Sequence, residues 1–241
     1  MALTEEQLQH FYREGYVVVP GLIPRTSVDA VLAAAAPVEA EGGGWGAQIF
    51  DHARSETQAG VHRLLVEPGV VDAARSIFGN EPNVFYGMLA VVQARGGSGL
   101  PWHQDNQYTQ ILGGAINIFA ALCDITLDKA ILWVAPGSHR LGTQPSKAAD
   151  AAPGHREAVV APENGVPLPA MKTGDVCIFD RCTYHRSLRN ETDQPRFAYA
   201  AQYQSENSRD AQTGGRVSPG IAARLRATDL ADLWRRDGLL T

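Results

Sequence analysis

Two residues with metal-binding side chains lie two positions apart in the stretch "PWHQDNQY", residues 101–108. Side chains two apart in an extended segment point to the same side, so His103 and Asp105 can converge on one point. A second histidine would complete a facial triad of two imidazoles and one carboxylate. That donor set suits iron(II), because it leaves the opposite coordination positions open for substrate and oxygen. On its own the pair is equally compatible with a solvated loop, so the rest of the chain must decide.

His185 is the best placed of the seven histidines to be the third ligand. It follows the strand-like run "GDVCIFD", residues 174–180, and a short turn, and it precedes a polar turn and a further strand. This places it at the mouth of a predicted barrel. His139 follows Pro-Gly-Ser instead, where a tight turn gives a histidine a structural role. The alternative for His185 is a buried histidine with its hydrogen bonds satisfied.

Arg196 opens an otherwise apolar strand, "RFAYAAQY", residues 196–203. An arginine is costly to bury unless an anion meets it. A small dicarboxylate would do so, because a guanidinium binds a carboxylate through two hydrogen bonds. The alternative is a surface salt bridge, which the apolar surroundings disfavour.

The elements that would position these residues change in character along the chain. Helices are predicted near 4–15, where Thr4 and Gln7 form a capping box, and near 27–36, 69–78 and 220–238. Strands are predicted near 16–23, 83–94, 115–125, 130–139, 175–180 and 196–204, and residues 142–169 form a surface excursion. Helices followed by strands predict an α+β chain with an antiparallel sandwich or barrel.

The stretch "EGGGWGAQIFD", residues 41–51, breaks all periodicity. Three glycines beside Trp45 and Phe50 predict a mobile loop whose apolar side chains could close over a site, so residues 41–56 are a candidate lid. A plain linker is the equally good alternative.

Composition excludes several classes of function. Of the 241 residues, 44% are hydrophobic and 20% charged, which is ordinary for a globular protein. A net charge of -5 gives no basic face for nucleic acid. No apolar run reaches the roughly 18 residues that a membrane span needs, and the acidic N-terminus is unlike a signal peptide, so we expect a cytoplasmic protein. Three cysteines predict neither a disulfide framework nor a structural zinc site.

An ordered set of motifs resembles the phytanoyl-CoA dioxygenase (PhyH) group of iron(II)/2-oxoglutarate-dependent oxygenases. The set comprises "WHQD" at 102–105, "LWVAPGSH" at 132–139, "GDVCIFD" at 174–180, "YHRS" at 184–187 and then Arg196. His-x-Asp alone is a weak signal, but the whole set in this order is specific, and the resemblance extends over residues 86–203. It implies a double-stranded β-helix (jelly-roll, cupin-like) core with N-terminal helices packed on one sheet. We expect one domain over 1–241, with helical support and a lid loop in 1–80, the jelly roll in 81–205 and a helical tail in 206–241.

The resemblance also assigns roles to individual residues. It implies that iron(II) is held by His103, Asp105 and His185. It implies that 2-oxoglutarate contacts Arg196 through its distal carboxylate, with Ser187, Asn117, Phe119 and Gln104 as further contacts. The chain departs from the group at Lys129 and Ala130, where relatives usually carry Glu-Asn-Gly, and this change concerns the rim of the pocket.

The implied reaction consumes O2 and 2-oxoglutarate, with ascorbate as a supporting reductant in vitro. It hydroxylates, or otherwise oxidises, an unactivated C–H bond of a small molecule, such as a natural-product intermediate or an amino-acid-like substrate. Related halogenases carry a small residue at the position of Asp105, so the carboxylate favours hydroxylation. Two alternatives remain: a non-catalytic ligand- or metal-binding relative, and a cupin-type enzyme that does not use 2-oxoglutarate. The protein is expected to work as a monomer or homodimer.

Overall fold

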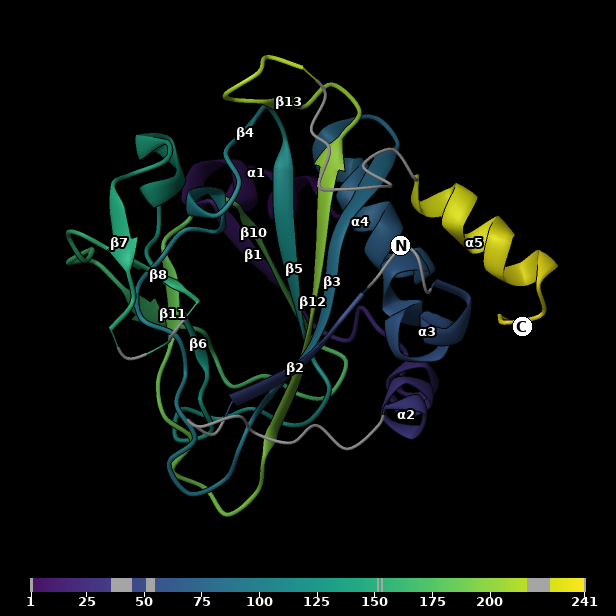
Figure 1. Cartoon of the computed structure of the whole chain (residues 1–241), viewed down its shortest axis with the longest axis horizontal. Helices are drawn as coiled ribbons and strands as arrows, with labels where there is room; N and C mark the ends of the chain where they lie inside the picture. Colours follow the sequence, from purple (N-terminus) through teal and green to yellow (C-terminus); the bar gives the residue numbers. More distant parts are fainter. Residues whose placement is uncertain are drawn as a thin grey trace.

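Two facing antiparallel sheets form the centre of the molecule (Figure 1). The computed structural model describes residues 2–35, 45–50, 55–150, 152, 154–215 and 226–240. The large sheet has the order β1 (Tyr16–Val19), β10 (Val176–Asp180), β5 (Ala115–Ala121), β12 (Arg196–Ser205), β3 (Pro82–Val92) and β2 (Trp45–Ile49). The smaller sheet has the order β11 (His185–Ser187), β6 (Leu132–Val134) and β9 (Val166–Pro167). This is the jelly-roll core that the sequence predicted.

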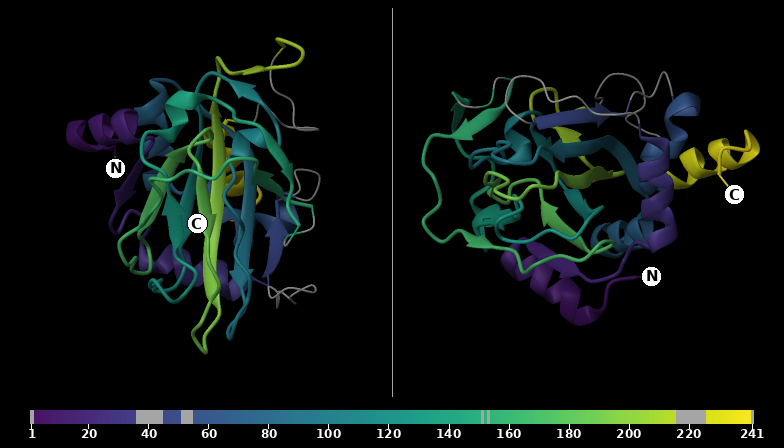
Figure 2. Two further views of the ribbon diagram at one scale, coloured as in Figure 1. Left: turned by 90° about the vertical axis from the view of Figure 1, so that its left-hand side faces the viewer. Right: turned by 90° about the horizontal axis from the view of Figure 1, so that it is seen from below.

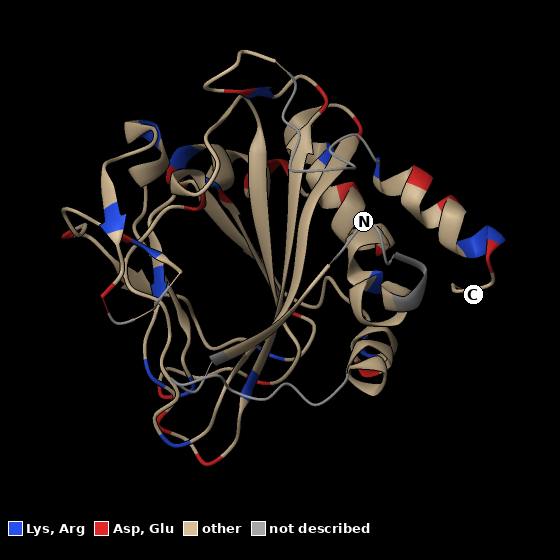
Figure 3. Ribbon diagram, in the orientation of Figure 1, with Lys and Arg blue, Asp and Glu red and all other residues tan. Residues whose placement is uncertain are grey.

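Alternation along the strands of the large sheet gives it two different apolar faces. In β5, Ile116 and Ile118 pack in the core beneath the helices, whereas Phe119 packs in the core between the two sheets. In β12, Tyr199 likewise packs in the core beneath the helices, and Ala198 packs in the core between the two sheets. Because side chains in a strand point alternately to opposite faces, the sheet can bury both faces at once. Charged residues lie mostly on helices and loops (Figure 3).

The helices cover the outer face of the large sheet, as Figures 1 and 2 show. They are α1 (Glu5–Glu14), α2 (Arg25–Ala34), α3 (Ser55–His62), the 3-10 helix η2 (Arg63–Val66), α4 (Pro68–Phe78) and α5 (Ala227–Arg236). The predicted capping box at the start of α1 is present, and Gly15 ends the helix in a left-handed conformation at φ 80°. None of the helices within the described residues is long and apolar enough to cross a membrane.

The prediction of a loop around Trp45 is wrong for residues 45–49. They form β2, which pairs with β3 at the edge of the large sheet. The glycines before and within this segment favour a loop in the sequence. The strand forms because β3 offers it a pairing edge, and no local pattern in the sequence reveals that neighbour. Phe50, expected as an exposed apolar side chain, is 6% exposed in the core beneath the helices and contacts His62 and Trp234. Residues 41–44 and 51–54 of the proposed lid lie outside the described residues, and residues 55–56 begin α3.

Phe50→Ala is therefore expected to destabilise the fold. Truncating a phenylalanine in a packed core costs on the order of 3–5 kcal/mol, because transfer energy is lost and a cavity remains. Chemical unfolding monitored by circular dichroism measures this loss. Ile49→Ala is a matched control on the neighbouring residue, whose side chain is 51% exposed, and it should change the free energy of unfolding by about 0.5 kcal/mol or less. Equal stability of the two variants would restore the loop interpretation for Phe50.

The segment between β6 and β10, which includes the predicted surface excursion, contains short elements of its own. It contains the 3-10 helix η4 (Ser138–Leu141) and two short strands that pair with each other, β7 (Ser146–Ala148) and β8 (Arg156–Ala158). A further small pair joins β4 (Ile111–Leu112) to β13 (Arg209–Asp210).

The turn at Lys129 and Ala130 precedes β6. Ala130 has a φ of 51°, in the left-handed region that glycine favours, and it is fully buried. Neither residue lines the central cavity. The departure from the family pattern therefore lies in the turn, and the rim of the cavity is built by other residues.

Candidate active site

Backbone pairing brings the two candidate histidine ligands together. The amide of His103 donates to the carbonyl of His185 at 3.0 Å, and the amide of His185 donates back to the carbonyl of His103 at 3.0 Å. Residues that exchange both hydrogen bonds stand directly opposite each other, so their side chains project to the same face. The imidazole centroids lie 4.1 Å apart. Glycine at position 99 allows this close pairing, since any side chain there would collide with the carbonyl of Ser187.

Each imidazole is oriented by a hydrogen bond from its Nδ1 to a backbone carbonyl. His103 Nδ1 lies 2.8 Å from the carbonyl oxygen of Pro101, and His185 Nδ1 lies 3.0 Å from that of Thr183. A carbonyl only accepts, so both Nδ1 atoms carry a proton, and a neutral imidazole in this tautomer has the lone pair of Nε2 free for a metal. Metal-bound histidines typically donate their other ring nitrogen to a backbone carbonyl in this way. Burial lowers the pKa of His103, which keeps this imidazole neutral.

Asp105 completes the cluster. Its Oδ1 lies 3.9 Å from Nε2 of His103 and 3.7 Å from Nε2 of His185, and the three ligand atoms are all within 4.8 Å of one another. Burial alone would raise the pKa of Asp105, but the nearby His185 and Arg181 and the hydrogen bond from Asn117 outweigh burial, so the pKa of this carboxyl lies below its ordinary value. Two imidazoles and one carboxylate, all buried and converging, match the donor set of a mononuclear iron(II) site.

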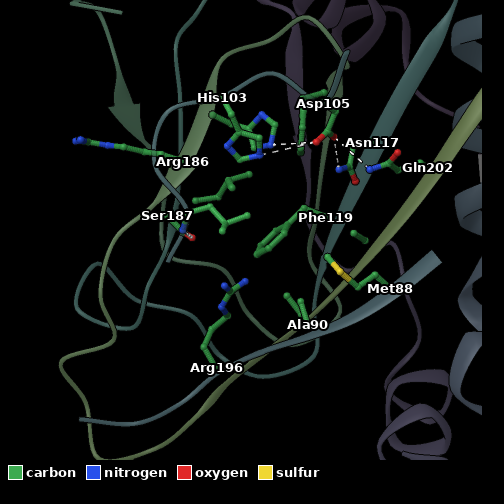
Figure 4. Close-up of a pocket in the computed structure, with 16 residues that line it drawn as sticks. Met88, Ala90, His103, Asp105, Asn117, Phe119, Arg186, Ser187, Arg196 and Gln202 are labelled. Carbon is green, nitrogen blue, oxygen red and sulfur yellow. Dashed lines mark hydrogen bonds and ion pairs between the residues drawn. The ribbon is translucent and has the colours of Figure 1, made fainter. Parts of the chain in front are cut away.

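The other oxygen of Asp105 is occupied by amide donors. Oδ2 accepts a hydrogen bond from Nδ2 of Asn117 at 2.7 Å and another from Nε2 of Gln202 at 3.3 Å (Figure 4). Asn117 thus lies at the cavity as predicted, but its amide nitrogen orients the carboxylate. Its Oδ1 is buried and has no hydrogen-bond partner in the part of the chain that the structure describes.

A cavity between the two sheets connects the triad with Arg196. Its other lining residues include Met88, Ala90, Leu100, Phe119, Leu132, Phe179, Ser187, Ala198 and Ala200. Most of these are apolar, which limits the access of water to the buried ligand atoms.

Arg196 is a buried cation that has no carboxylate partner among the described residues. It is 4% exposed, and within that part of the chain its Nε has no hydrogen-bond partner and no acid forms an ion pair with it. Its guanidinium carbon lies 5.4 Å from the centroid of Phe119. Burial lowers its pKa to about 10, so the side chain is still protonated at neutral pH. Ser187 lines the same part of the cavity, and its hydroxyl accepts a hydrogen bond from the amide of Leu100 at 3.2 Å.

Gln104, predicted as a co-substrate contact, points away from the cavity. Its Nε2 donates to the carbonyls of Gly142, at 3.0 Å, and Cys182, at 2.5 Å, and its Oε1 accepts from the amide of Gln144 at 2.7 Å. It lies between two ligands in an extended segment, so alternation directs it to the opposite side. Its contacts anchor the ligand-bearing loop to the rest of the protein.

Three polar residues near the site received no role from the sequence. Gln202 lines the cavity, and inward alternation along β12 from Arg196 could have identified it. Arg181, four residues before His185, is 3% exposed. The side chain of Arg186 extends away from the other residues drawn in Figure 4. Its guanidinium carbon lies 4.7 Å from the ring centroids of Trp102 and of Trp133, which agrees with a packing role for Trp102.

Comparisons with known proteins agree with this fold and site. The model of the family described as "Phytanoyl-CoA dioxygenase (PhyH)" matches residues 11–198. The chain is 32% identical over 144 residues to phytanoyl-CoA dioxygenase domain-containing protein 1 of Mus musculus, which covers 55% of this chain and 48% of that protein. It is 25% identical over 236 residues to ectoine dioxygenase of Bordetella bronchiseptica, covering 81% of this chain and 73% of that enzyme. The chain therefore spans about half the length of the mouse relative.

Among solved structures, the epimerase SnoN in complex with Fe3+, alpha ketoglutarate and nogalamycin RO superposes with a TM-score of 0.71 at 22% identity. The match covers 90% of each chain. A jelly roll with a buried His-Asp-His cluster is the arrangement of cupin-fold proteins that hold one metal ion. Within that class, this chain belongs to the phytanoyl-CoA dioxygenase family.

Proposed function

We propose that the protein is an iron(II)- and 2-oxoglutarate-dependent oxygenase that hydroxylates a small molecule. The observation that supports this most strongly is Arg196, a buried guanidinium that faces the triad's cavity without an acid partner. Such a charge is costly unless an anion completes it. A dicarboxylate that spans from the triad to Arg196 would do so, whereas a cupin-type enzyme without 2-oxoglutarate has no need of this arginine.

The residues present fit the two cofactors. His103, Asp105 and His185 would hold iron(II), and Arg196 with Ser187 would hold the far carboxylate of 2-oxoglutarate, with Phe119 packed beside it. Bound iron and 2-oxoglutarate together supply the oxidation, with O2, of an unactivated C–H bond. The two Nδ1 hydrogen bonds keep both imidazoles in the ligating tautomer. The apolar lining excludes water from the reacting centre.

The site supports hydroxylation or a related oxidation in preference to halogenation. Asp105 fills the coordination position that a halide would need, which disfavours halogenation. The curated relatives include ectoine dioxygenases and the superposed structures include an epimerase bound to a natural product. These names support a compact amino-acid-like compound or a natural-product intermediate as the class of substrate.

The reaction outcome can be tested with a panel of such compounds. The purified protein, loaded with iron(II) and ascorbate, is incubated with each candidate, and consumption of 2-oxoglutarate above the basal rate identifies the substrate. Mass spectrometry under 18O2 then decides the outcome, since hydroxylation predicts a product that carries one labelled oxygen. A product that forms without gain of an oxygen atom would replace hydroxylation with desaturation, cyclisation or epimerisation.

A further inference from the structure

Arg181 is a buried arginine beside the triad, and the proposed reaction assigns it no role. One of its terminal nitrogens donates to the carbonyl of Asp105 at 2.9 Å and to that of Thr109 at 3.4 Å, and the other donates to Oε1 of Gln202. The guanidinium carbon lies 4.8 Å from the centroid of Phe85. No acid among the described residues forms an ion pair with it. An arginine that is buried without an acid partner has a large desolvation cost, which its hydrogen bonds and ring contact must offset.

The contact with Arg181 determines how the amide of Gln202 is oriented. A guanidinium has donors only, so the end of the amide that meets Arg181 must be the oxygen. Nε2 of Gln202 then points the other way, to Oδ2 of Asp105 at 3.3 Å. Asn117 donates to the same oxygen at 2.7 Å. Oδ2 is therefore held by two donors, and Oδ1 is left to face the two imidazoles.

We propose that Arg181 is a positioning residue that, through Gln202 and through the backbone of Asp105, fixes this aspartate as a ligand with one oxygen. If Asp105 bound with both oxygens, it would close a coordination position that the proposed reaction leaves open. The same guanidinium belongs to the turn that leads into His185, so it also ties the two ligand-bearing segments together. The inference rests on the proposed function only in taking the triad as a metal site.

Cobalt(II) is a suitable probe, because it binds the donor set of iron(II), is stable in air and has a visible spectrum that depends on coordination number. Its dissociation constant is measured by competition with a chromophoric chelator. Gln202→Met and Arg181→Met should each weaken cobalt binding by about 10- to 100-fold, the usual effect of losing a residue that orients a metal ligand. Their visible spectra should also differ from that of the unmodified protein.

Gln204→Met is the matched control, because it removes a buried amide from the same strand, two residues further along. It should leave the affinity and the spectrum of bound cobalt unchanged. Thermal unfolding of the metal-free variants shows whether each is folded. If Arg181→Met does not fold, Gln202→Met still tests the proposal, because it removes the contact between Gln202 and Asp105.

A double variant tests whether Arg181 acts through Gln202. Residues in one network give non-additive losses, so Arg181→Met with Gln202→Met should weaken cobalt binding by less than the product of the two single effects. Unchanged cobalt affinity and spectrum in Gln202→Met, or fully additive losses, would overturn the proposal. These results are independent of the oxygenase assignment, because cobalt binding requires neither 2-oxoglutarate nor turnover. Failure of the unmodified protein to form succinate would count against the proposed function alone.

Discussion

His103→Ala and His185→Ala are each expected to abolish iron(II) binding while the protein remains folded. Each variant removes one of three converging donors and leaves only two. The loss of affinity should exceed the roughly 10- to 100-fold effect of losing a residue that only orients a metal ligand. Metal content after loading and desalting measures this directly, with circular dichroism as the test of folding.

His10→Ala is the control for this experiment, since His10 lies in α1, outside the cavity. It should retain as much iron as the unmodified protein. If either ligand variant kept stoichiometric iron, the metal would have to lie elsewhere. Both the triad and the proposed role of Arg181 would then be wrong.

Arg196→Ala is expected to weaken 2-oxoglutarate binding far more than iron binding. The substitution leaves the distal carboxylate of the co-substrate buried without its cation, which costs on the order of 2–5 kcal/mol. That corresponds to a loss of roughly 30- to several-thousand-fold in affinity. Anaerobic titration of the iron-loaded protein, followed through the absorption band of the iron–2-oxoglutarate complex, gives the dissociation constant.

Two controls make the role of Arg196 specific. Arg196→Lys keeps the charge but loses the planar pair of donors, so its affinity should fall between those of the alanine variant and the unmodified protein. Arg25→Ala removes an exposed arginine of α2 and should have no effect on the titration. An alanine variant that binds 2-oxoglutarate normally would move the carboxylate anchor to another residue.

Much of the candidate site could be predicted because its residues follow from short-range patterns. The spacing of His103 and Asp105 indicates a shared side, and Arg196 is conspicuous as the only charge in its apolar strand. The same rule of alternation excludes Gln104 from the cavity, since it lies between two ligands that point inward. Grouping Gln104 with the co-substrate contacts therefore overlooked what the extended segment already implied.

The remaining features depend on contacts between distant segments. The strand at 45–49 exists because β3 offers it an edge, and no periodicity within its five residues indicates this partner. The contacts of Arg181 join three segments separated by up to 97 residues, so the types of these residues alone cannot reveal them. Asn117 was placed at the cavity correctly, yet its bond to Asp105 is visible only in three dimensions.

The most direct test of the account is whether the protein converts 2-oxoglutarate to succinate. The purified chain is incubated in air with iron(II), ascorbate and 2-oxoglutarate, and succinate is quantified beside the His185→Ala variant. We predict slow succinate formation by the unmodified protein, absent in the variant and stimulated by the true substrate. A fully iron-loaded protein that forms no succinate, with or without the candidate substrates, would contradict the account and favour a binding protein or a cupin-type enzyme that does not use 2-oxoglutarate.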